Sequence, residues 1–305
     1  LDSHYSALPR WTRCERTQYT RCMTREIDAG TLTIRGRSLG GMYTGLHVPQ
    51  LSILLDVGTA LRTGAAASHL FISHAHVDHI GALPSLLGMR SLIGVNKPLN
   101  VYFPAALDEH LRDALNSFSA MHHWPFEVLL KPLESGEVVC LKKNLHVRAF
   151  KTLHPVPSLG YVFFRRINKL KAEFQHLPGV EIGKRRKAGE SLFYEKERLE
   201  LGYATDTLPE VLPQNPWLYD VNHLILECTF LDDRKTVRKA RAGCHIHLDE
   251  LLEYLPLLKN PHITLMHFSQ LYTPREVEII LQQRCGDEFM ARCTPLLPDT
   301  DHWWD

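Results

Sequence analysis

The sequence has no long apolar run, no Cys-X-X-Cys motif and almost no net charge. No stretch approaches the roughly 18 consecutive apolar residues of a membrane-spanning helix, so we expect no membrane span. The formal net charge of +1 means that any site for a polyanion is a local patch. The seven cysteines are odd in number and scattered, which argues against a disulfide scaffold and favours free thiols in a reducing compartment.

The order of apolar stretches predicts one large α/β domain with a tail at each end. Residues 1–25 are basic and have little apolar periodicity, so we expect a flexible N-terminal tail; a processed organelle-targeting segment is the alternative. Residues 26–298 contain runs of strands joined by helices, which indicates layered sheets with helices outside. Residues 165–198 are rich in Lys and Arg and are interpreted as an insertion, and residues 299–305 form a C-terminal tail. We expect a cytoplasmic location, or an organellar one if the tail is such a remnant.

The densest cluster of chemically active side chains is His74-Ala75-His76-Val77-Asp78-His79. The apolar run 69–72 precedes it and is typical of a buried strand, and residues 80–87 are typical of a helix. The cluster therefore lies at the carboxyl end of a strand, where α/β folds place their chemistry. A lone His-X-His is more often a loop without a metal, but four ligand-type residues at this spacing favour a divalent metal site.

Three further ligand-type residues, His154, Asp206 and His267, each follow an apolar strand-like stretch. Each is a weak signal alone, because Asp and His at a strand end often cap the next element. Together they are expected to bring their side chains to the same edge of the sandwich as the histidine cluster.

The His-X-His-X-Asp-His pattern resembles the signature of the metallo-β-lactamase superfamily. From about Asp28 to about Leu297, the chain is similar to the ribonuclease Z branch, the tRNA 3′-processing endonucleases in their short form. This resemblance implies an αββα four-layer metallo-β-lactamase sandwich with a short basic insertion. It also implies two divalent metal ions, with zinc favoured by the histidine content and manganese or iron as alternatives.

The resemblance assigns the metal ligands in two sets that share one carboxylate. The first set is His74, His76 and His154, the second is Asp78, His79 and His267, and the shared ligand is Asp206.

Catalytic roles also follow from the resemblance. Asp78 orients the attacking water or accepts its proton. The stretch that begins His245-Ile246-His247 is similar to a ribonuclease Z motif with a catalytic histidine, a role that maps onto His245, whereas His247 is expected to start a helix on a solvated surface. Leu226-Glu227-Cys228-Thr229-Phe230 is similar to a stretch whose glutamate contacts that histidine. A carboxylate raises the pKa of an adjacent imidazole, so His245 would act as a general acid on the leaving 3′-oxygen.

Residues 170–189 are similar to the Lys-Leu-Lys … Gly-X-X-Ile … Gly pattern of the short-form enzymes. Their positive charges are expected to contact RNA phosphates, which position a substrate without reading its sequence. The expected RNA-binding residues are Lys171, Lys184, Arg185, Arg186 and Lys187. A charged, solvated loop is the alternative interpretation. A second basic stretch, residues 234–241, precedes His245.

These features predict a zinc-dependent endoribonuclease that removes 3′ trailers from precursor tRNA through a water activated by two metal ions. The expected partners are precursor tRNA or another RNA and, from the resemblance, a second copy in a homodimer. A hydrolase of a small ester or cyclic phosphodiester and a non-catalytic RNA-binding relative are the alternatives. Three departures leave the ligands intact: residues 35–41 replace the family's Gly-Thr-Gly loop, Ala204-Thr205-Asp206-Thr207 replaces the usual Gly-Asp-Thr, and Leu271 replaces an expected arginine.

Overall fold

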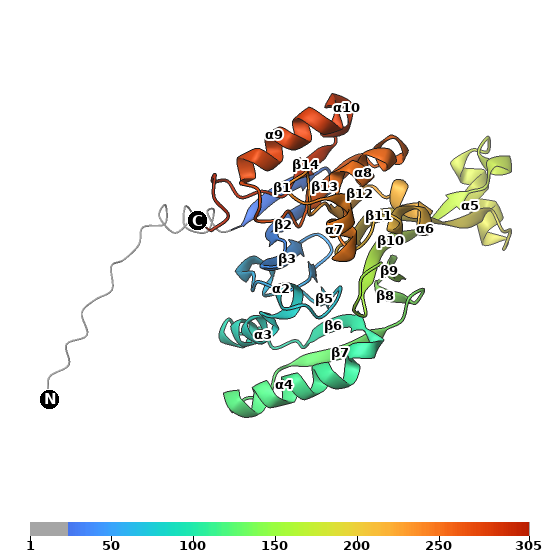
Figure 1. The fold of residues 1–305 in the computed structure, drawn as a ribbon. Coiled ribbons are helices and arrows are strands. Elements are labelled where there is room, and N and C mark those ends of the chain that lie inside the picture. Colours follow the sequence, from blue (N-terminus) through green and yellow to red (C-terminus); the bar gives the residue numbers. More distant parts are fainter. Residues whose placement is uncertain (1–23, 305) are drawn as a thin grey trace, which may run out of the picture.

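The computed structural model describes residues 24–304 and contains two seven-stranded sheets packed face to face between two layers of helices (Figure 1). The strands of the first sheet are β1 (Arg25–Ala29), β2 (Leu32–Leu39), β3 (Tyr43–Val48), β4 (Ile53–Leu55), β5 (His69–Phe71), β6 (Leu99–Pro104) and β7 (Val128–Leu133). Those of the second are β8 (Val138–Lys142), β9 (Leu145–Lys151), β10 (Leu159–Leu170), β11 (Phe193–Ala204), β12 (His223–Glu227), β13 (His262–Met266) and β14 (Cys293–Pro295).

The helices fall into two groups and one outlier. The first group is α2 (Val77–Ile80), α3 (Leu83–Leu92) and α4 (Asp108–His122). The second group is α6 (Val211–Gln214), α7 (Val237–Ala242), α8 (Leu248–Tyr254), α9 (Pro274–Cys285) and α10 (Asp287–Met290). Helix α5 (Gly179–Lys187) lies apart from both groups (Figure 1). Short 3-10 turns are η1 (Arg62–Gly64), η2 (Ala105–Leu107), η3 (Ala172–Phe174), η4 (Pro216–Tyr219) and η5 (Leu255–Leu257).

Each sheet is half antiparallel and half parallel. The first runs in the order β1 to β7, with β4 to β7 parallel, and the second in the order β14 to β8, with β11 to β14 parallel. Because the carboxyl ends of parallel strands meet at one edge, the loops after β5, β11 and β13 come together there. The helix–sheet–sheet–helix order confirms the predicted αββα sandwich.

Three apolar clusters fill the spaces between the layers. Between the sheets, Phe71 stacks on Tyr102 with ring centroids 4.5 Å apart and contacts Phe163 edge-on. Leucines of α3 and α4 cover the outer face of the first sheet, and α8 and α9 cover the second. The covering residues recur at helical spacing, such as Leu111 and Leu115 on α4, as expected for helices with one buried face.

The histidine cluster starts a helix one turn earlier than predicted. Asp78 and His79 lie in α2, and α3 begins only at Leu83, so the one helix expected from Ile80 onward is two short helices. The cluster is thus divided: His74 and His76 precede the helix, and Asp78 and His79 lie within it.

The segment 165–198, which we call the arm, extends β10 and β11 beyond the sandwich. Its antiparallel pairs run from Arg165↔Arg198 to Leu170↔Phe193, and η3 and α5 lie at its tip (Figure 1). Eleven residue steps separate Phe193 from Ala204 at the other end of β11. At about 3.3 Å per residue this is roughly 36 Å of strand, so the arm tip lies far from the edge where β11 ends.

The two predicted tails have different outcomes. Residues 1–23 lie outside the described part of the chain, and β1 begins at Arg25. Near the other end, Trp303 is buried; its indole N–H donates to the carbonyl of Tyr272, and the Tyr43 hydroxyl donates to the carbonyl of Trp303. This end of the chain therefore packs against the second helical layer. Within residues 24–304, the helices are too short or too polar for a membrane span.

A close backbone contact at Gly58 fixes α2 against the first sheet. The Val57 N–H donates to the carbonyl of His79 and the Gly58 N–H to that of Thr44, both at 2.7 Å. A side chain at Gly58 would overlap the carbonyl of Asp78. Two residues of the histidine cluster therefore depend on a glycine at this position.

We predict that Gly58→Ala lowers the free energy of unfolding by about 1–3 kcal/mol, because an added methyl must displace α2. Urea denaturation measures this change. The control is Gly88→Ala in α3, where the methyl would meet no atom within 4 Å, and which should be neutral or stabilise by about 0.5–1 kcal/mol. Equal stabilities of the two variants would show that the contact at Gly58 imposes no constraint.

Candidate metal centre

All seven side chains predicted as metal ligands meet at one edge of the sandwich. They come from the loops after four strands and from α2. His74 and His76 follow β5, Asp78 and His79 lie in α2, His154 follows β9, Asp206 follows β11, and His267 follows β13. Their ligand atoms form two groups whose members lie within 4.8 Å of one another.

The first group contains three imidazole nitrogens and one carboxylate oxygen. His76 Nδ1 lies 3.0 Å from His74 Nε2 and 3.2 Å from His154 Nε2. Asp206 Oδ2 lies 3.6 Å from His74 Nε2 and 3.9 Å from His154 Nε2. These four atoms surround a common point.

The second group uses the other oxygen of the same aspartate. His79 Nε2 and His267 Nε2 are 3.2 Å apart, and Asp78 Oδ2 lies 3.4 Å from the first and 3.5 Å from the second. Asp206 Oδ1 lies 3.2 Å from His79 Nε2 and 3.3 Å from His267 Nε2. Asp206 therefore offers one oxygen to each group.

The spacing of these atoms fits divalent cations. A tetrahedron of nitrogen and oxygen ligands at about 2.0–2.1 Å from zinc has edges of about 3.3–3.4 Å, close to most separations in both groups. Acceptor atoms at this separation repel one another unless a proton or a cation lies between them. The donor set, four of whose members are buried, thus fits metal ions better than a network of protein hydrogen bonds alone.

A buried carboxylate that the sequence analysis missed, Asp56, holds the histidine cluster from behind. It accepts hydrogen bonds from Ser73 N–H (2.6 Å), Ser73 Oγ–H (2.8 Å), the Tyr203 hydroxyl (2.6 Å) and His79 Nδ1–H (2.7 Å). The bond to Nδ1 fixes the tautomer of His79 and leaves Nε2 as the ligating nitrogen. The signal in the sequence is that Asp56 directly follows the apolar run Ile53–Leu55, which forms β4.

Glu227 holds the opposite side of the centre through Thr229. The Thr229 hydroxyl donates to Glu227 Oε2 and accepts from His267 Nδ1 at 3.0 Å. The same carboxylate accepts from the Thr207 N–H at 2.6 Å, next to Asp206. Thr229 was part of the quoted Glu-X-Thr-Phe stretch, but no role had been predicted for it.

The backbone is left-handed at three of the acidic and histidine residues of the centre. The φ angles of Asp56, Asp206 and His267 are 55°, 47° and 63°. This conformation costs a residue with a Cβ about 1 kcal/mol or more and concentrates at functional sites, where surrounding contacts enforce it. Here each of these residues ends or closely follows a strand, so the strain turns its side chain into the centre.

The charges in the centre depend strongly on one another. Burial would raise the pKa of Asp206, but the surrounding histidines, His267 and His79 foremost, lower it well below its usual range. Burial, aided by His79, lowers the pKa of His74 to about 2. Negative charge on Asp206 is thus held by positive charge close to it, the role that a bound cation also fills.

His245 lies beside the two groups and contacts the predicted partner. Its Nδ1 is 3.2 Å from Glu227 Oε1, and its ring stacks on that of His267 with centroids 5.4 Å apart. Burial would lower the pKa of His245, but Glu227 outweighs it, with smaller contributions from Asp206 and Asp78, and raises the pKa to about 9. The side chain is 20% exposed, so a substrate can reach it.

Comparison with known proteins identifies the family. A model described as "Beta-lactamase superfamily domain" matches residues 45–268. The chain is 32% identical over 273 residues to tRNase Z TRZ2, chloroplastic, of Arabidopsis thaliana, covering 88% of this chain and 76% of the relative. It is 34% identical to tRNase Z TRZ1 of the same plant over 247 residues, covering 80% of this chain and 88% of the relative. The chain belongs to the tRNase Z family. The predicted resemblance to ribonuclease Z is thereby confirmed.

Two solved structures share the fold of this tRNase Z-family chain. Human tRNase Z, short form (ELAC1), has a TM-score of 0.51 at 21% identity, covering 77% of this chain and 92% of that one. The metallo-β-lactamase fold protein YhfI from Bacillus subtilis has a TM-score of 0.58 at 14% identity, covering 86% and 94%. At these identities the likeness concerns the fold alone.

Other predicted residues lie away from the centre. His247 starts α8 as expected, its Nδ1 accepting from the Asp249 N–H, but it is buried rather than solvated. The predicted RNA-binding residues belong to the arm, so the structure does not bring them to the metal centre. They are Lys171, Lys184, Arg185, Arg186 and Lys187.

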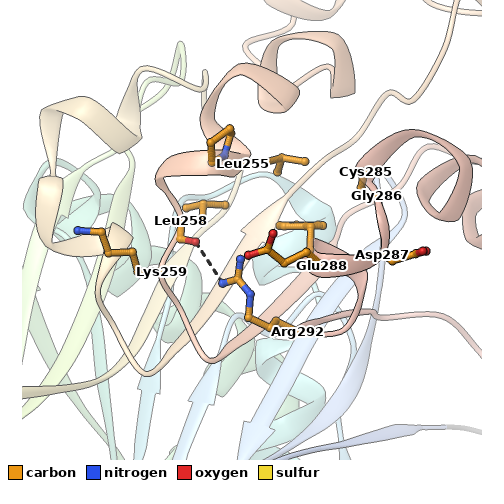
Figure 2. Close-up of a pocket in the computed structure, with 10 residues that line it drawn as sticks. Leu255, Leu258, Lys259, Cys285, Gly286, Asp287, Glu288 and Arg292 are labelled. Atoms are coloured by element: carbon orange, nitrogen blue, oxygen red, sulfur yellow. Dashed lines mark hydrogen bonds between the residues drawn. The ribbon is translucent and has the colours of Figure 1, made fainter.

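A separate cavity of about 570 Å³ lies between η5 and the α9–α10 turn (Figure 2). Its lining includes Lys259, Glu288 and Arg292, and none of the seven ligands of the metal centre. The Arg292 guanidinium donates to the carbonyls of Leu258 and Asn260, so its charge is already used to tie two backbone segments together. This cavity is therefore not the candidate site.

We predict that Asp56→Asn weakens divalent metal binding about 10–100-fold, the usual effect of removing an outer hydrogen-bond partner of a ligand histidine. The asparagine side chain carries an NH2 donor, so it cannot accept all four hydrogen bonds that the Asp56 carboxylate accepts. Titration against a competing chelator measures the effect. Tyr203→Phe is the control, because it removes one donor and keeps the charge, and its effect should be smaller. Unaltered metal affinity in Asp56→Asn would contradict the proposed support.

Proposed function

We propose that this chain is a metal-dependent endoribonuclease that removes 3′ trailers from precursor tRNA. The proposal rests above all on two ligand groups that share Asp206 beside a His245–Glu227 pair that is outside both predicted ligand sets. Relatives named tRNase Z, at 32% and 34% identity over most of the chain, support the same activity.

The proposed cofactors are two divalent ions, one in each ligand group with Asp206 between them. Zinc is the proposed ion because imidazole nitrogens dominate the donor set, with manganese or iron as alternatives. Two such ions, when bound, supply Lewis acidity towards a phosphoryl oxygen and lower the pKa of a bound water.

Two protein groups would move protons in this reaction. The Asp78 carboxylate accepts from the Gly41 N–H at 3.0 Å and is 12% exposed, so it is held in place at the open side of the centre. It would orient the attacking water or accept its proton. His245 has Nδ1 engaged by Glu227, which leaves Nε2 to deliver a proton to the leaving 3′-oxygen.

The ion pairs divide the basic residues of the stretch 234–241 into two sets. Arg234 is bound by Asp232 and Glu276, and Arg241 by Glu210 and Glu250. By contrast, Lys235, Arg238 and Lys239 make no ion pair with any residue in the described part of the chain. Lys235 Nζ lies 5.1 Å from the Phe230 ring, which in turn contacts His245. We propose that these three side chains hold phosphates near the scissile bond.

The deciding assay compares two substrates with metal-replete protein. A precursor tRNA with a 3′ trailer should be cut once at the trailer junction, and bis-p-nitrophenyl phosphate should be hydrolysed slowly. Hydrolysis of the small ester without cleavage of the RNA would favour the alternative of a small-ester hydrolase. Binding of RNA with neither activity would favour the non-catalytic relative.

We predict that the basic cluster of α5 contributes to RNA affinity rather than to chemistry, because the arm tip is remote from the metal centre. Changing Lys184, Arg185, Arg186 and Lys187 together to Ala should weaken precursor tRNA binding and flatten its salt dependence, since fewer counterions are released. Turnover of bis-p-nitrophenyl phosphate should stay unchanged. Binding titrations at several salt concentrations measure the slope.

The matched control for that variant removes four exposed positive charges elsewhere. The control positions are Arg62, Lys97, Lys131 and Lys143. Their change to Ala lowers the net charge equally, so it should affect the salt slope less if the arm is the binding element. Equal slopes in the two variants would mean that only total charge matters.

We predict that His245→Ala loses about 10²–10⁴-fold in precursor tRNA cleavage, the usual contribution of a general acid, while p-nitrophenyl ester turnover is largely kept. The ribose 3′-oxygen is a poor leaving group and needs a proton, whereas p-nitrophenolate does not. At saturating metal, Glu227→Ala should show the same split more mildly, since it only tunes the acid. His110→Ala, at an exposed position of α4, should change neither activity.

The same variant tests whether His245 binds metal, because one of its ring nitrogens lies within 4.8 Å of ligand atoms of Asp206 and His267. Elemental analysis should find the same metal content in His245→Ala as in the wild type. Loss of metal, or equal losses on both substrates, would contradict the general-acid role.

Oligomeric state and compartment stay predictions. We propose a homodimer, which light scattering of the full chain tests directly. We propose a cytoplasmic location, with an organelle as the alternative. Localisation of the full chain fused to a fluorescent protein distinguishes the two. The organelle is the alternative because one plant relative is named as chloroplastic.

A further inference from the structure

We infer that the two ligand groups bind divalent ions with unequal affinity and that the group of Asp78, His79 and His267 fills first. The inference rests on the proposed two-metal function and adds an order of binding to it. It follows from the contacts behind each histidine and from the distribution of carboxylates.

Both histidines of the second group are held by buried carboxylates. His79 Nδ1 donates directly to Asp56 at 2.7 Å. His267 Nδ1 donates to Thr229, whose hydroxyl donates to Glu227. Because Asp56 and Glu227 accept hydrogen bonds only, each chain of bonds has one direction, and the Nε2 lone pair of each histidine must face the centre. The second group is therefore organised before any ion arrives.

The first group has less support behind its histidines. His74 Nδ1 contacts Ser73 Oγ at 3.0 Å, which leads on to Asp56. His154 is buried, yet its Nδ1 has no hydrogen-bond partner in the described part of the chain. His76 is exposed and follows an extended stretch of backbone. In the described part of the chain, no hydrogen bond from behind fixes the tautomer of these two imidazoles, which weakens ion binding.

The carboxylates favour the same group. Asp78 belongs only to the second group, whereas the first has only its share of Asp206. Asp56 adds negative charge directly behind His79, and Glu227 adds it behind His267 through Thr229. The second group has two histidines with outer partners and the first has one. Since each outer partner of a ligand histidine typically contributes 10–100-fold in metal affinity, we expect the first equivalent to bind about 10–100-fold more tightly than the second.

The test is a titration of the chelator-stripped full chain with Co²⁺, followed by its visible absorption and by a competing chelator. The wild type should bind two equivalents in two distinct steps. His76→Ala should keep the tight equivalent and lose the weak one. Asp78→Ala should lose the tight equivalent and keep the weak one. The reverse pattern, or two equal steps in the wild type, would overturn the inference.

Thr229 supplies a second, gentler test. Thr229→Val removes the hydroxyl with little change of shape, and it should weaken the tight equivalent about 10–100-fold while the weak one is unchanged. Thr229→Ser keeps the hydroxyl and should restore the wild-type value. A tight equivalent unaffected by Thr229→Val would overturn the proposed cause. A wild type that binds no Co²⁺ would instead refute the proposed function itself.

Discussion

The architecture depends on one buried carboxylate, Asp206, that stands between two groups of histidines. A buried negative charge is costly unless positive charge or hydrogen-bond donors surround it. Here the neighbours are imidazole nitrogens on both oxygens, contributed by loops from both sheets. The edge of the sandwich is thus assembled around a charge that needs a cation, and the left-handed backbone at Asp206 shows that the fold accepts strain to place it there.

Two further buried acids, Asp56 and Glu227, explain how loops so far apart in sequence reach one geometry. Asp56 joins the loop after β5 to α2 and to β11 through Tyr203. Glu227 joins the loop after β11 to the loops that contain Thr229 and His245. Each acid is fully engaged by donors, so its burial stabilises one arrangement of the ligands rather than several. The ligand positions are therefore a consequence of these two networks.

The sequence was enough to predict which side chains meet at this edge but not what holds them in place. The meeting of His154, Asp206 and His267 could be predicted because each follows an apolar strand, and strands that run in the same direction end at one edge. The role of Asp56 could not be predicted because the four donors that it binds lie 17 to 147 residues away in the sequence. Trp303 was missed because its partners, Tyr272 and Tyr43, are likewise distant, and a short polar stretch predicts a tail.

The arm holds the predicted RNA-binding residues apart from the metal centre, a separation that composition alone does not reveal. The basic cluster of α5 lies beyond Phe193, which is roughly 36 Å along β11 from the end that leads to Asp206, so only a long substrate can contact both places. A small ester reaches the metal centre but gains nothing from the arm. On the proposed function, a structured RNA would gain affinity at a point remote from the reaction, and that binding energy would help to align the scissile bond. On the proposed function, discrimination between these substrates would therefore depend on distance within the fold rather than on base recognition.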